Sequence, residues 1–355
     1  MRHHTALIAL ILAAVMLAAC ARPTTLERLT RLQERGIMSG HQDDTFYGLT
    51  WNARAGDSTF SDIKLVCGDY PAVMGFELGG LELGQERNLD SVPFRLMRRE
   101  ILAHIRRGGF VTISWHPYNI VTNGNAWDNS DTTVVARILP GGTHHAQFIT
   151  WLDRIADFLN TVSQTPDGVK ATLIFRPWHE NNGGWFWWGR DTCTPEQYLQ
   201  LWNMTQDYLT DEKGLDNLIW SYSPNLDGNM TMQDFLRWYP GDQRVQLIGL
   251  DAYQNGSRED YQRDLNANLD LLCRYAAEHH RLFALTECGM RSVPQDDWWT
   301  GSLYPCLAGR QISYFLAWRN NDQTERFAPS PGSNDAPDFR ALTTKSDILM
   351  LNDIK

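Results

Sequence analysis

The sequence of 355 residues has no cluster of basic residues of the kind that binds phosphate groups. Lysine and arginine together number 32, against 42 aspartate and glutamate residues, which gives a formal net charge of −10. Because phosphate contacts dominate the affinity of proteins for nucleic acids, we expect no nucleic-acid partner. Charged residues make up 21% of the chain and hydrophobic residues 43%, a balance that indicates a folded chain rather than a disordered one.

Several catalytic motifs are also missing. No GxSxG segment marks a serine hydrolase, and no GxGxxG follows the first expected strand as in dinucleotide-binding folds. His179-Glu180 could begin a zinc-binding HExxH motif, but position 183 is glycine. No CxxC or Cys/His spacing suggests a metal site. The segment GHQDD (residues 40–44) could bind an ion, although a hydrogen-bonded floor under the first strand is the favoured interpretation. We therefore expect no metal and no cofactor.

The first twenty residues have the pattern of an export signal. A basic stretch from Arg2 to His4 precedes an apolar run from Thr5 to Leu17, and small residues stand before Cys20. A transmembrane helix needs about 20 apolar residues, and this run is shorter. Its end resembles a bacterial lipobox, which implies cleavage before Cys20 and lipidation of that cysteine. We expect residues 1–19 to be a lipoprotein signal peptide and the mature chain to be anchored to a membrane, the outer membrane being favoured.

Export places the mature chain in a compartment where disulfides can form. Five cysteines remain after Cys20, and an odd number leaves at least one thiol unpaired within the chain. The pairing stays open among Cys67, Cys193, Cys273, Cys288 and Cys306.

Short apolar runs alternate with longer amphipathic segments through the rest of the chain. Several runs, such as VTISW, TLIF and VQLIGL, are almost wholly apolar, as strands buried on both faces should be. Expected helices lie between the runs, among them 93–107, 146–162, 195–209 and 260–277. The expected strands cover residues 37–41, 71–77, 110–116, 171–180, 217–224, 245–253, 282–287 and 312–319. Eight such units predict a single-domain (β/α)8 barrel of the TIM type, and an open doubly wound sheet is the alternative.

Each expected strand ends in a polar or aromatic cluster, and the active sites of such barrels gather at those ends. Glu180 ends the fourth strand in RPWHENNGGWFWWG, and Glu287 ends the seventh in TECG. Two carboxylates that face one cleft can cleave a glycosidic bond, one as a protonated acid and the other as an ionised group. Burial and neighbouring charge would separate their pKa values. For a reaction that retains configuration, we expect the two carboxyl groups about 5–5.5 Å apart.

The segment RPWHENNGGWFWWG resembles the acid/base motif of glycoside hydrolase family 26, the β-mannanase family of clan A. GHQDD, WHPYN, LDAY, TECG and WRN resemble that family in order and spacing, so the resemblance spans roughly residues 37–320. It implies that residues 20–355 form a catalytic barrel that acts by a retaining double displacement.

The resemblance also implies roles for individual residues around the cleavage point. Glu180 matches the general acid/base and Glu287 the nucleophile. Tyr253 matches a tyrosine that hydrogen-bonds the nucleophile, and Asp251 lies beside it.

Further matches imply contacts to the sugar chain. His116 and His179 match substrate-binding histidines, and Trp318 matches the aromatic platform at the cleavage site, with Arg319 as a neighbouring polar contact. On the leaving-group side an aromatic residue matches Trp185, and on the other side a loop tryptophan matches Trp127.

The 14 tryptophans of the chain suggest either a large core or a surface that stacks on flat ligands. Of the aromatic run at residues 185–188, we expect one or two rings to stack on sugar and the rest to pack. Trp298-Trp299 could do either. We expect a structural role for Trp51, Trp202, Trp220 and Trp238.

Together these features predict a monomeric glycoside hydrolase of the mannan endo-1,4-β-mannosidase type. Its expected substrates are mannan, galactomannan, glucomannan or manno-oligosaccharides. One alternative is activity on another β-glycan, such as β-1,3-xylan or mixed-linkage β-glucan. Another is a non-catalytic glycan-binding lipoprotein, which the presence of Glu180, Glu287 and Tyr253 disfavours. Endo or exo attack stays open, because it depends on whether a loop such as residues 119–142 blocks one end of the cleft.

Overall fold

The structure is a computed structural model that describes residues 24–163 and 171–355. The predicted signal peptide and Cys20 lie outside the described residues. Among the helices within those two ranges, none is both long enough and apolar enough to cross a membrane.

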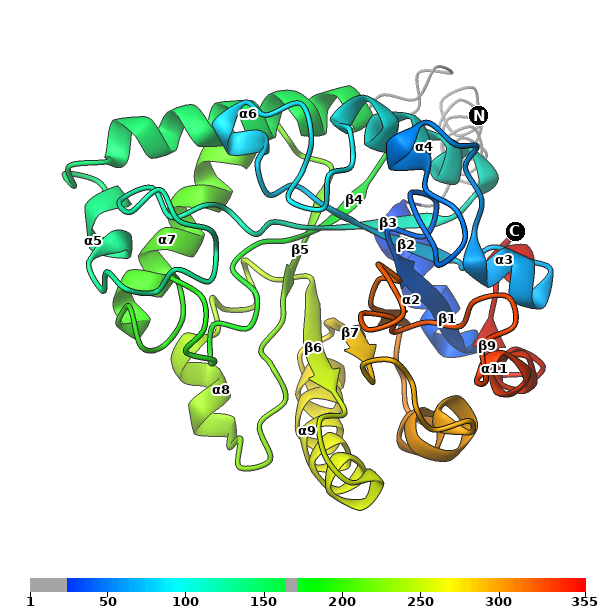
Figure 1. Cartoon of the computed structure of the whole chain (residues 1–355). Coiled ribbons are helices and arrows are strands. Elements are labelled where there is room, and N and C mark those ends of the chain that lie inside the picture. Colours follow the sequence, from blue (N-terminus) through cyan, green and yellow to red (C-terminus); the bar gives the residue numbers. More distant parts are fainter. Residues whose placement is uncertain (1–23, 164–170) are drawn as a thin grey trace, which may run out of the picture.

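Eight parallel strands form a closed barrel with helices packed around it (Figure 1). Neighbours along the chain pair with each other, and the ring closes where Met38 lies opposite Tyr314 and Gly40 opposite Val73. This arrangement confirms the predicted (β/α)8 barrel. The strands are β1 (Ile37–Gln42), β2 (Val73–Glu77), β3 (Phe110–Ser114), β4 (Leu173–Arg176), β5 (Leu218–Tyr222), β6 (Leu247–Tyr253), β7 (Leu282–Gly289) and β8 (Tyr314–Ala317).

The fourth strand is shorter than the sequence suggested. It ends at Arg176, because Trp178 and Glu180 take left-handed backbone angles, with φ of 55° and 53°. The amide of Glu180 donates to the carbonyl of Ser223 at 2.8 Å in the loop after β5. Glu180 therefore lies on the loop that follows β4 rather than on the strand itself.

Helices cover the outside of the barrel, and the predicted ones lie within a few residues of their expected bounds. The helix α7 begins after Thr194, whose side chain forms a capping box with Gln197. Its end passes into a π-helical turn at Tyr208–Glu212. The helices are α2 (Thr25–Arg35), α3 (Asp62–Cys67), α4 (Phe94–Arg107), α5 (Val134–Ile138), α6 (His145–Ser163), α7 (Pro195–Asp207), α8 (Met232–Trp238), α9 (Arg258–Glu278), α10 (Tyr304–Leu307) and α11 (Ala336–Thr343).

The bottom of the barrel is closed by both ends of the described chain. Leu29 and Leu32 of α2 pack in one apolar cluster with the first residues of several strands, among them Val73 and Phe110, and with Ile354. A two-residue strand, β9 (Ile348–Leu349), pairs with the start of β1. These contacts place α2 at the amino-terminal ends of the strands, opposite the polar clusters that follow them.

Most of the tryptophans are buried, and the five cysteines of the described residues are buried or partly buried. Trp298 and Trp299 are fully buried. Trp202 is also fully buried, and Trp220 and Trp51 are nearly so, which agrees with the structural role expected of these three residues. Trp238 is only half-buried, so its packing role is partial. The cysteines at 67, 193, 273, 288 and 306 are free thiols.

Candidate active site

A cleft of about 580 Å³ opens at the carboxyl ends of the strands. Loops after several strands contribute to its walls, as the convergence of the polar clusters predicted. Among the residues predicted from the sequence, those that line it are His116, Trp127, Glu180, Trp185, Tyr253, Trp318 and Arg319. Residues that sequence reasoning did not assign also line it, notably Glu77, Asp90 and Asn225.

Three buried carboxylates meet at the base of this cleft. One oxygen each of Glu180, Asp251 and Glu287 lies within 4.8 Å of the other two. The exposed fractions are 8%, 0% and 4% in that order. The nearest oxygens of Glu180 and Glu287 are therefore at most 4.8 Å apart, whereas the carboxyl groups of an inverting enzyme are about 6.5–9.5 Å apart to leave room for a water. This proximity favours the shorter spacing of a retaining pair over that of an inverting pair.

Arg176, from the end of β4, joins two of these carboxylates. Its Nη1 donates to Oδ2 of Asp251 at 2.8 Å, and its Nη2 donates to Oε1 of Glu287. Burial opposes the charge on Arg176, but the two carboxylates outweigh it and raise the pKa of the guanidinium. The three carboxylates are close enough to share a metal ion, yet Arg176 already supplies a positive charge to two of them.

Tyr253 forms a hydrogen bond with the second carboxylate oxygen of Glu287. Its hydroxyl donates to Oε2 of Glu287 at 2.6 Å, as the resemblance implied. Burial, and then the charge of Glu287, raise the pKa of Tyr253 well above its usual range, so the phenol keeps its proton. Glu287 thus receives one donor on each oxygen, and the two donors fix the orientation of its carboxyl group.

The surroundings of Glu180 favour the protonated form of its carboxyl group. Burial raises the pKa of its carboxyl well above the usual range, and the charges of Asp251 and Glu287 raise it further. Trp185 works against this, because its Nε1 donates to Oε2 of Glu180 at 2.7 Å. Glu180 is therefore the protonated member of the pair and can donate a proton to a leaving group.

The loop that carries Glu180 is held by bonds to its backbone. Trp188 Nε1 donates to the carbonyl of His179 at 2.8 Å, and the Tyr198 hydroxyl donates to that of Trp178 at 2.9 Å. A left-handed backbone at a residue with a side chain costs on the order of 1–3 kcal/mol. These bonds hold the strained turn and fix where the Glu180 carboxyl points.

Glu77 anchors one wall of the cleft. Its Oε2 lies 2.7 Å from Nδ1 of His116 and accepts from the hydroxyl of Ser114 at 2.6 Å. Burial would raise the pKa of Glu77, but His116 and these hydrogen bonds lower it to about 2. Because a carboxylate can only accept, Nδ1 of His116 carries a proton. The sequence signal was the strand exit FELGG, where no partner could be identified.

His179 stands behind His116 rather than in the cleft. The Nε2 atoms of the two rings are 3.0 Å apart, and His179 is 1% exposed. Burial, and then the charge of Arg176, lower the pKa of His179 well below its usual range, so this ring is neutral. His179, Asp251 and Glu287 are absent from the cleft lining. His179 contacts His116 of the cleft wall and Asp251 contacts Arg176, whereas Glu287 is 4% exposed below the lining residues Glu180 and Tyr253.

Aromatic rings form much of the cleft surface. Trp127 is 48% exposed and stacks on His116, with ring centroids 5.3 Å apart. Trp185 is 37% exposed, whereas Phe186 and the two tryptophans after it are buried, so one ring of the aromatic run is free to stack on sugar. Trp318 is half-buried, with its ring centroid 6.4 Å from that of His116.

Charged contacts join the loops that line the cleft. Arg319, after β8, pairs with Asp90 in the loop after β2, and also with Glu325 at 3.3 Å. In the segment 119–142, the side chain of Asn129 donates to the carbonyl of Gly184 at 2.6 Å. This segment therefore contacts the loop that carries Glu180.

GHQDD forms a hydrogen-bonded floor under the cleft. His41 Nδ1 lies 2.8 Å from Oδ1 of Asp44, and the Tyr47 hydroxyl donates to Oδ2 of Asp43 at 2.6 Å. Burial raises the pKa of Asp43 to about 6. The hydrogen bonds favoured from the sequence are present but incomplete, because one buried polar atom each of His41, Gln42, Asp43 and Asp44 has no partner.

Comparison with protein families gives a match to the model described as glycosyl hydrolase family 26, over residues 19–325. A mannan endo-1,4-β-mannosidase of Bifidobacterium adolescentis is 31% identical over 91% of this chain and 34% of its own length. An enzyme of the same name from Bacillus subtilis is 31% identical over 61% of this chain and 58% of its own length. The chain thus spans about a third of the first relative and less than two thirds of the second.

Solved structures show the same likeness over nearly the whole chain. A β-mannanase from Bacteroides ovatus, BoMan26A, has 43% sequence identity and a TM-score of 0.88, covering 92% of this chain and 94% of that one. A variant of the endo-β-1,4-mannanase of Cellulomonas fimi has 33% identity and a TM-score of 0.82, covering 92% of this chain and 74% of that one.

Proposed function

The chain belongs to glycosyl hydrolase family 26, and we propose that it cleaves β-1,4-mannosidic linkages with retention of configuration. The substrates are mannan, galactomannan, glucomannan or manno-oligosaccharides. One observation carries the proposal: an oxygen of Glu180 lies within 4.8 Å of an oxygen of Glu287, with the pKa of Glu180 raised by its surroundings and both oxygens of Glu287 held by donors. The names of the related proteins support the choice of mannan.

In the first step, Glu180 donates its proton to the glycosidic oxygen while an oxygen of Glu287 attacks the anomeric carbon. The bond to the leaving sugar breaks, and a bond between the sugar and Glu287 forms. Arg176 and Tyr253 hold the two oxygens of Glu287 in place beforehand, which lowers the cost of orienting the nucleophile.

In the second step, Glu180 takes a proton from a water molecule, and the water oxygen displaces Glu287 from the sugar. The charge of Glu287 is one of the causes that raise the pKa of Glu180. That charge disappears while Glu287 is bound to the sugar, so the pKa of Glu180 falls. The acid of the first step thereby becomes the base of the second.

The cleft walls supply the sugar contacts in this proposal. Trp318 stacks under the sugar at the cleavage site with Arg319 beside it, and Trp185 stacks on the leaving group next to Glu180. Trp127 and His116 bind on the other side. Glu77 and His179 position His116, and Asp251 positions Arg176. Phe, Trp and His rings offer the flat apolar faces that pack against sugars, with a polar edge left for hydroxyl groups.

For the chain as a whole, we propose that residues 1–19 are removed and that residues 20–355 form the mature enzyme, a monomer anchored through lipid on Cys20 to the outer membrane. Support comes from the sequence of the leader. Intact-mass measurement of the membrane fraction tests this: a Cys20→Ser variant should lose the lipid mass and leave the membrane. Recovery of the unmodified parent in the soluble fraction would contradict the anchor.

The reaction is tested with two variants and two substrates. Glu287→Ala should abolish turnover of mannan and of a dinitrophenyl β-mannobioside, because both need the nucleophile. Glu180→Ala should lose about 10²–10⁴-fold on mannan but keep the first step on the activated mannobioside, whose leaving group needs no proton. Proton NMR of the first product should show the β-anomer. Equal losses by Glu180→Ala on both substrates, or an α-anomer, would refute the proposal.

A further inference from the structure

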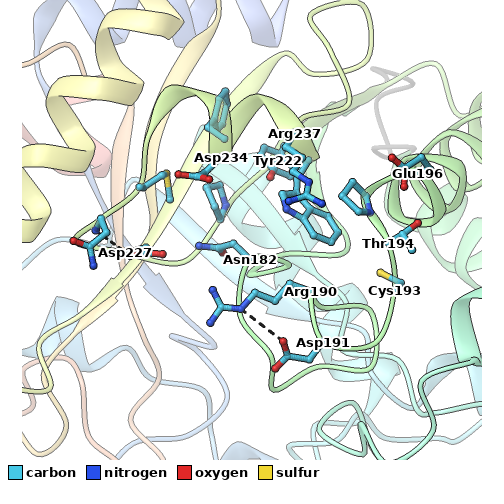
Figure 2. Close-up of a pocket in the computed structure, with 16 residues that line it drawn as sticks. Asn182, Arg190, Asp191, Cys193, Thr194, Glu196, Tyr222, Asp227, Asp234 and Arg237 are labelled. Carbon is cyan, nitrogen blue, oxygen red and sulfur yellow. Dashed lines mark hydrogen bonds and ion pairs between the residues drawn. The ribbon is translucent and has the colours of Figure 1, made fainter.

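A second cavity, larger than the catalytic cleft, lies beside the loop that carries Glu180. Its volume is about 710 Å³. Asn182, Arg190 and Asp191 line it from that loop, and Asp234 and Arg237 line it from α8, as Figure 2 shows. No residue that lines this cavity also lines the cleft.

Two asparagines separate the second cavity from the cleft. The Nδ2 of Asn182 donates to the carbonyl of Asn225 at 2.8 Å, and the amide of Asn225 donates to Oδ1 of Asn182 at 2.7 Å. Asn182 lines the cavity and Asn225 lines the cleft. Glu180 is two residues before Asn182, so the cavity adjoins the cleft on the side of the proton donor, which is where a leaving sugar departs.

The walls of the cavity combine an aromatic ring with charged side chains. Trp238 is half-buried, and packs edge-on against Tyr198 with centroids 5.6 Å apart. Arg190 and Asp191 are 56% and 66% exposed and lie 3.8 Å apart. Arg237 is exposed, and its charge acts on the carboxylates of Glu196 and Asp234. Guanidinium and carboxylate groups match pairs of hydroxyls, and an indole face matches the apolar face of a sugar ring.

The charges of the cavity select the kind of ligand. Two guanidinium groups face four carboxylates, those of Asp191, Glu196, Asp227 and Asp234, so an acidic ligand would be repelled. A metal ion is not favoured either, because among the described residues the carboxylates that converge are Glu180, Asp251 and Glu287 in the cleft. A neutral ligand rich in hydroxyl groups fits these walls.

We propose that this cavity is a second glycan-binding site that holds the leaving-group portion of the mannan chain beyond the cleft. The inference rests on the proposed function, because it takes the substrate and the direction of the chain from it. Binding there would add affinity for long chains and none for a short oligosaccharide that fills the cleft alone.

The test compares long and short ligands in a chain that cannot turn them over. In a Glu287→Gln background, soluble glucomannan and mannotriose are titrated by calorimetry. Trp238→Ala should weaken glucomannan binding about tenfold, equivalent to about 1.4 kcal/mol, and so lower the ratio of the two affinities. The double variant Arg190→Ala with Asp191→Ala should lower the same ratio. Both of these side chains are exposed, so this variant keeps the test valid if Trp238→Ala fails to fold. Leu236→Ala is the matched control, since Leu236 is 45% exposed on the same helix and does not line the cavity.

An affinity ratio unchanged from the parent in both the Trp238→Ala and the double variant would overturn the inference. A ratio that falls equally in Leu236→Ala would also overturn it, because the effect would then belong to the helix and not to the cavity. Failure of the proposed function is distinguishable: the protein with Glu287 intact would release no reducing sugar from glucomannan. If it does release sugar while the cavity variants match the parent, the function stands and the second site does not.

Discussion

Replacing Trp185 with phenylalanine should move the alkaline limb of the pH profile to higher pH. The indole Nε1 donates to Oε2 of Glu180 at 2.7 Å and favours the ionised carboxylate over the neutral acid. This contact therefore lowers the pKa of Glu180, and its loss raises it. The alkaline limb marks the pH at which Glu180 loses the proton that the first step needs, so that limb follows the pKa upward.

The size of the shift follows from the exposure of the donor. A hydrogen bond to a charged group contributes roughly 1.5–3 kcal/mol when buried, but Trp185 is 37% exposed, and water replaces part of the lost contact. A remaining difference of about 1 kcal/mol corresponds to about 0.7 pH unit. The assay is kcat/KM for mannotetraose against pH, because this quantity reports the groups of the free enzyme.

Trp127→Phe is the matched control, since Trp127 is also an exposed indole in the cleft and its contacts are to His116 and Phe186 rather than to Glu180. It should leave the position of the alkaline limb unchanged, whatever it does to the height of the profile. With a dinitrophenyl β-mannobioside, the limb should vanish from kcat/KM in the parent and in both variants. A limb that stays in place in Trp185→Phe, or moves to lower pH, would refute the account of Glu180.

Three further results are expected. Arg176→Met should lower the free energy of unfolding at pH 7 by about 3–5 kcal/mol because it leaves buried carboxylates without a partner, and urea titrations of the parent and the variant should show this difference. Asp43→Asn should flatten the pH dependence of stability between about pH 4 and 6. The pKa of Asp43 in the folded protein is raised to about 6, so the parent loses stability as the pH rises through that window. Identical slopes for the two proteins would count against this. Glu77→Gln puts an amide donor or a misplaced acceptor against His116, and should lower kcat/KM on the order of tenfold. Thermal unfolding of the variant, monitored by circular dichroism, should stay cooperative. An unchanged kcat/KM would show that Glu77 does not position the His116 ring.

The sequence was sufficient for the barrel and for its two principal carboxylates. Parallel strands buried on both faces give near-continuous apolar runs, and each run is followed by polar residues at the same end of the barrel. Glu180 and Glu287 could therefore be placed together although 107 positions separate them along the chain. Tyr253 could be assigned to Glu287 through the family resemblance alone.

Other features depend on contacts that no local pattern encodes. The end of β4 at Arg176 results from left-handed angles at Trp178 and Glu180, which are unusual for residues with side chains. The pairing of Glu77 with His116 joins the last residue of β2 to the loop after β3, 39 residues further along the chain. The second cavity depends on the orientation of α8, since the sequence alone favoured a structural role for Trp238.

The closed bottom of the barrel determines how a tethered enzyme would face its surroundings. The helix α2 starts at Thr25 and packs on the amino-terminal ends of the strands, whereas the cleft opens at their carboxyl ends. A chain held at a surface by the residues before Thr25 would therefore turn its cleft away from that surface. Polymers arriving from the open side would meet the cleft first, without having to pass between the protein and the membrane.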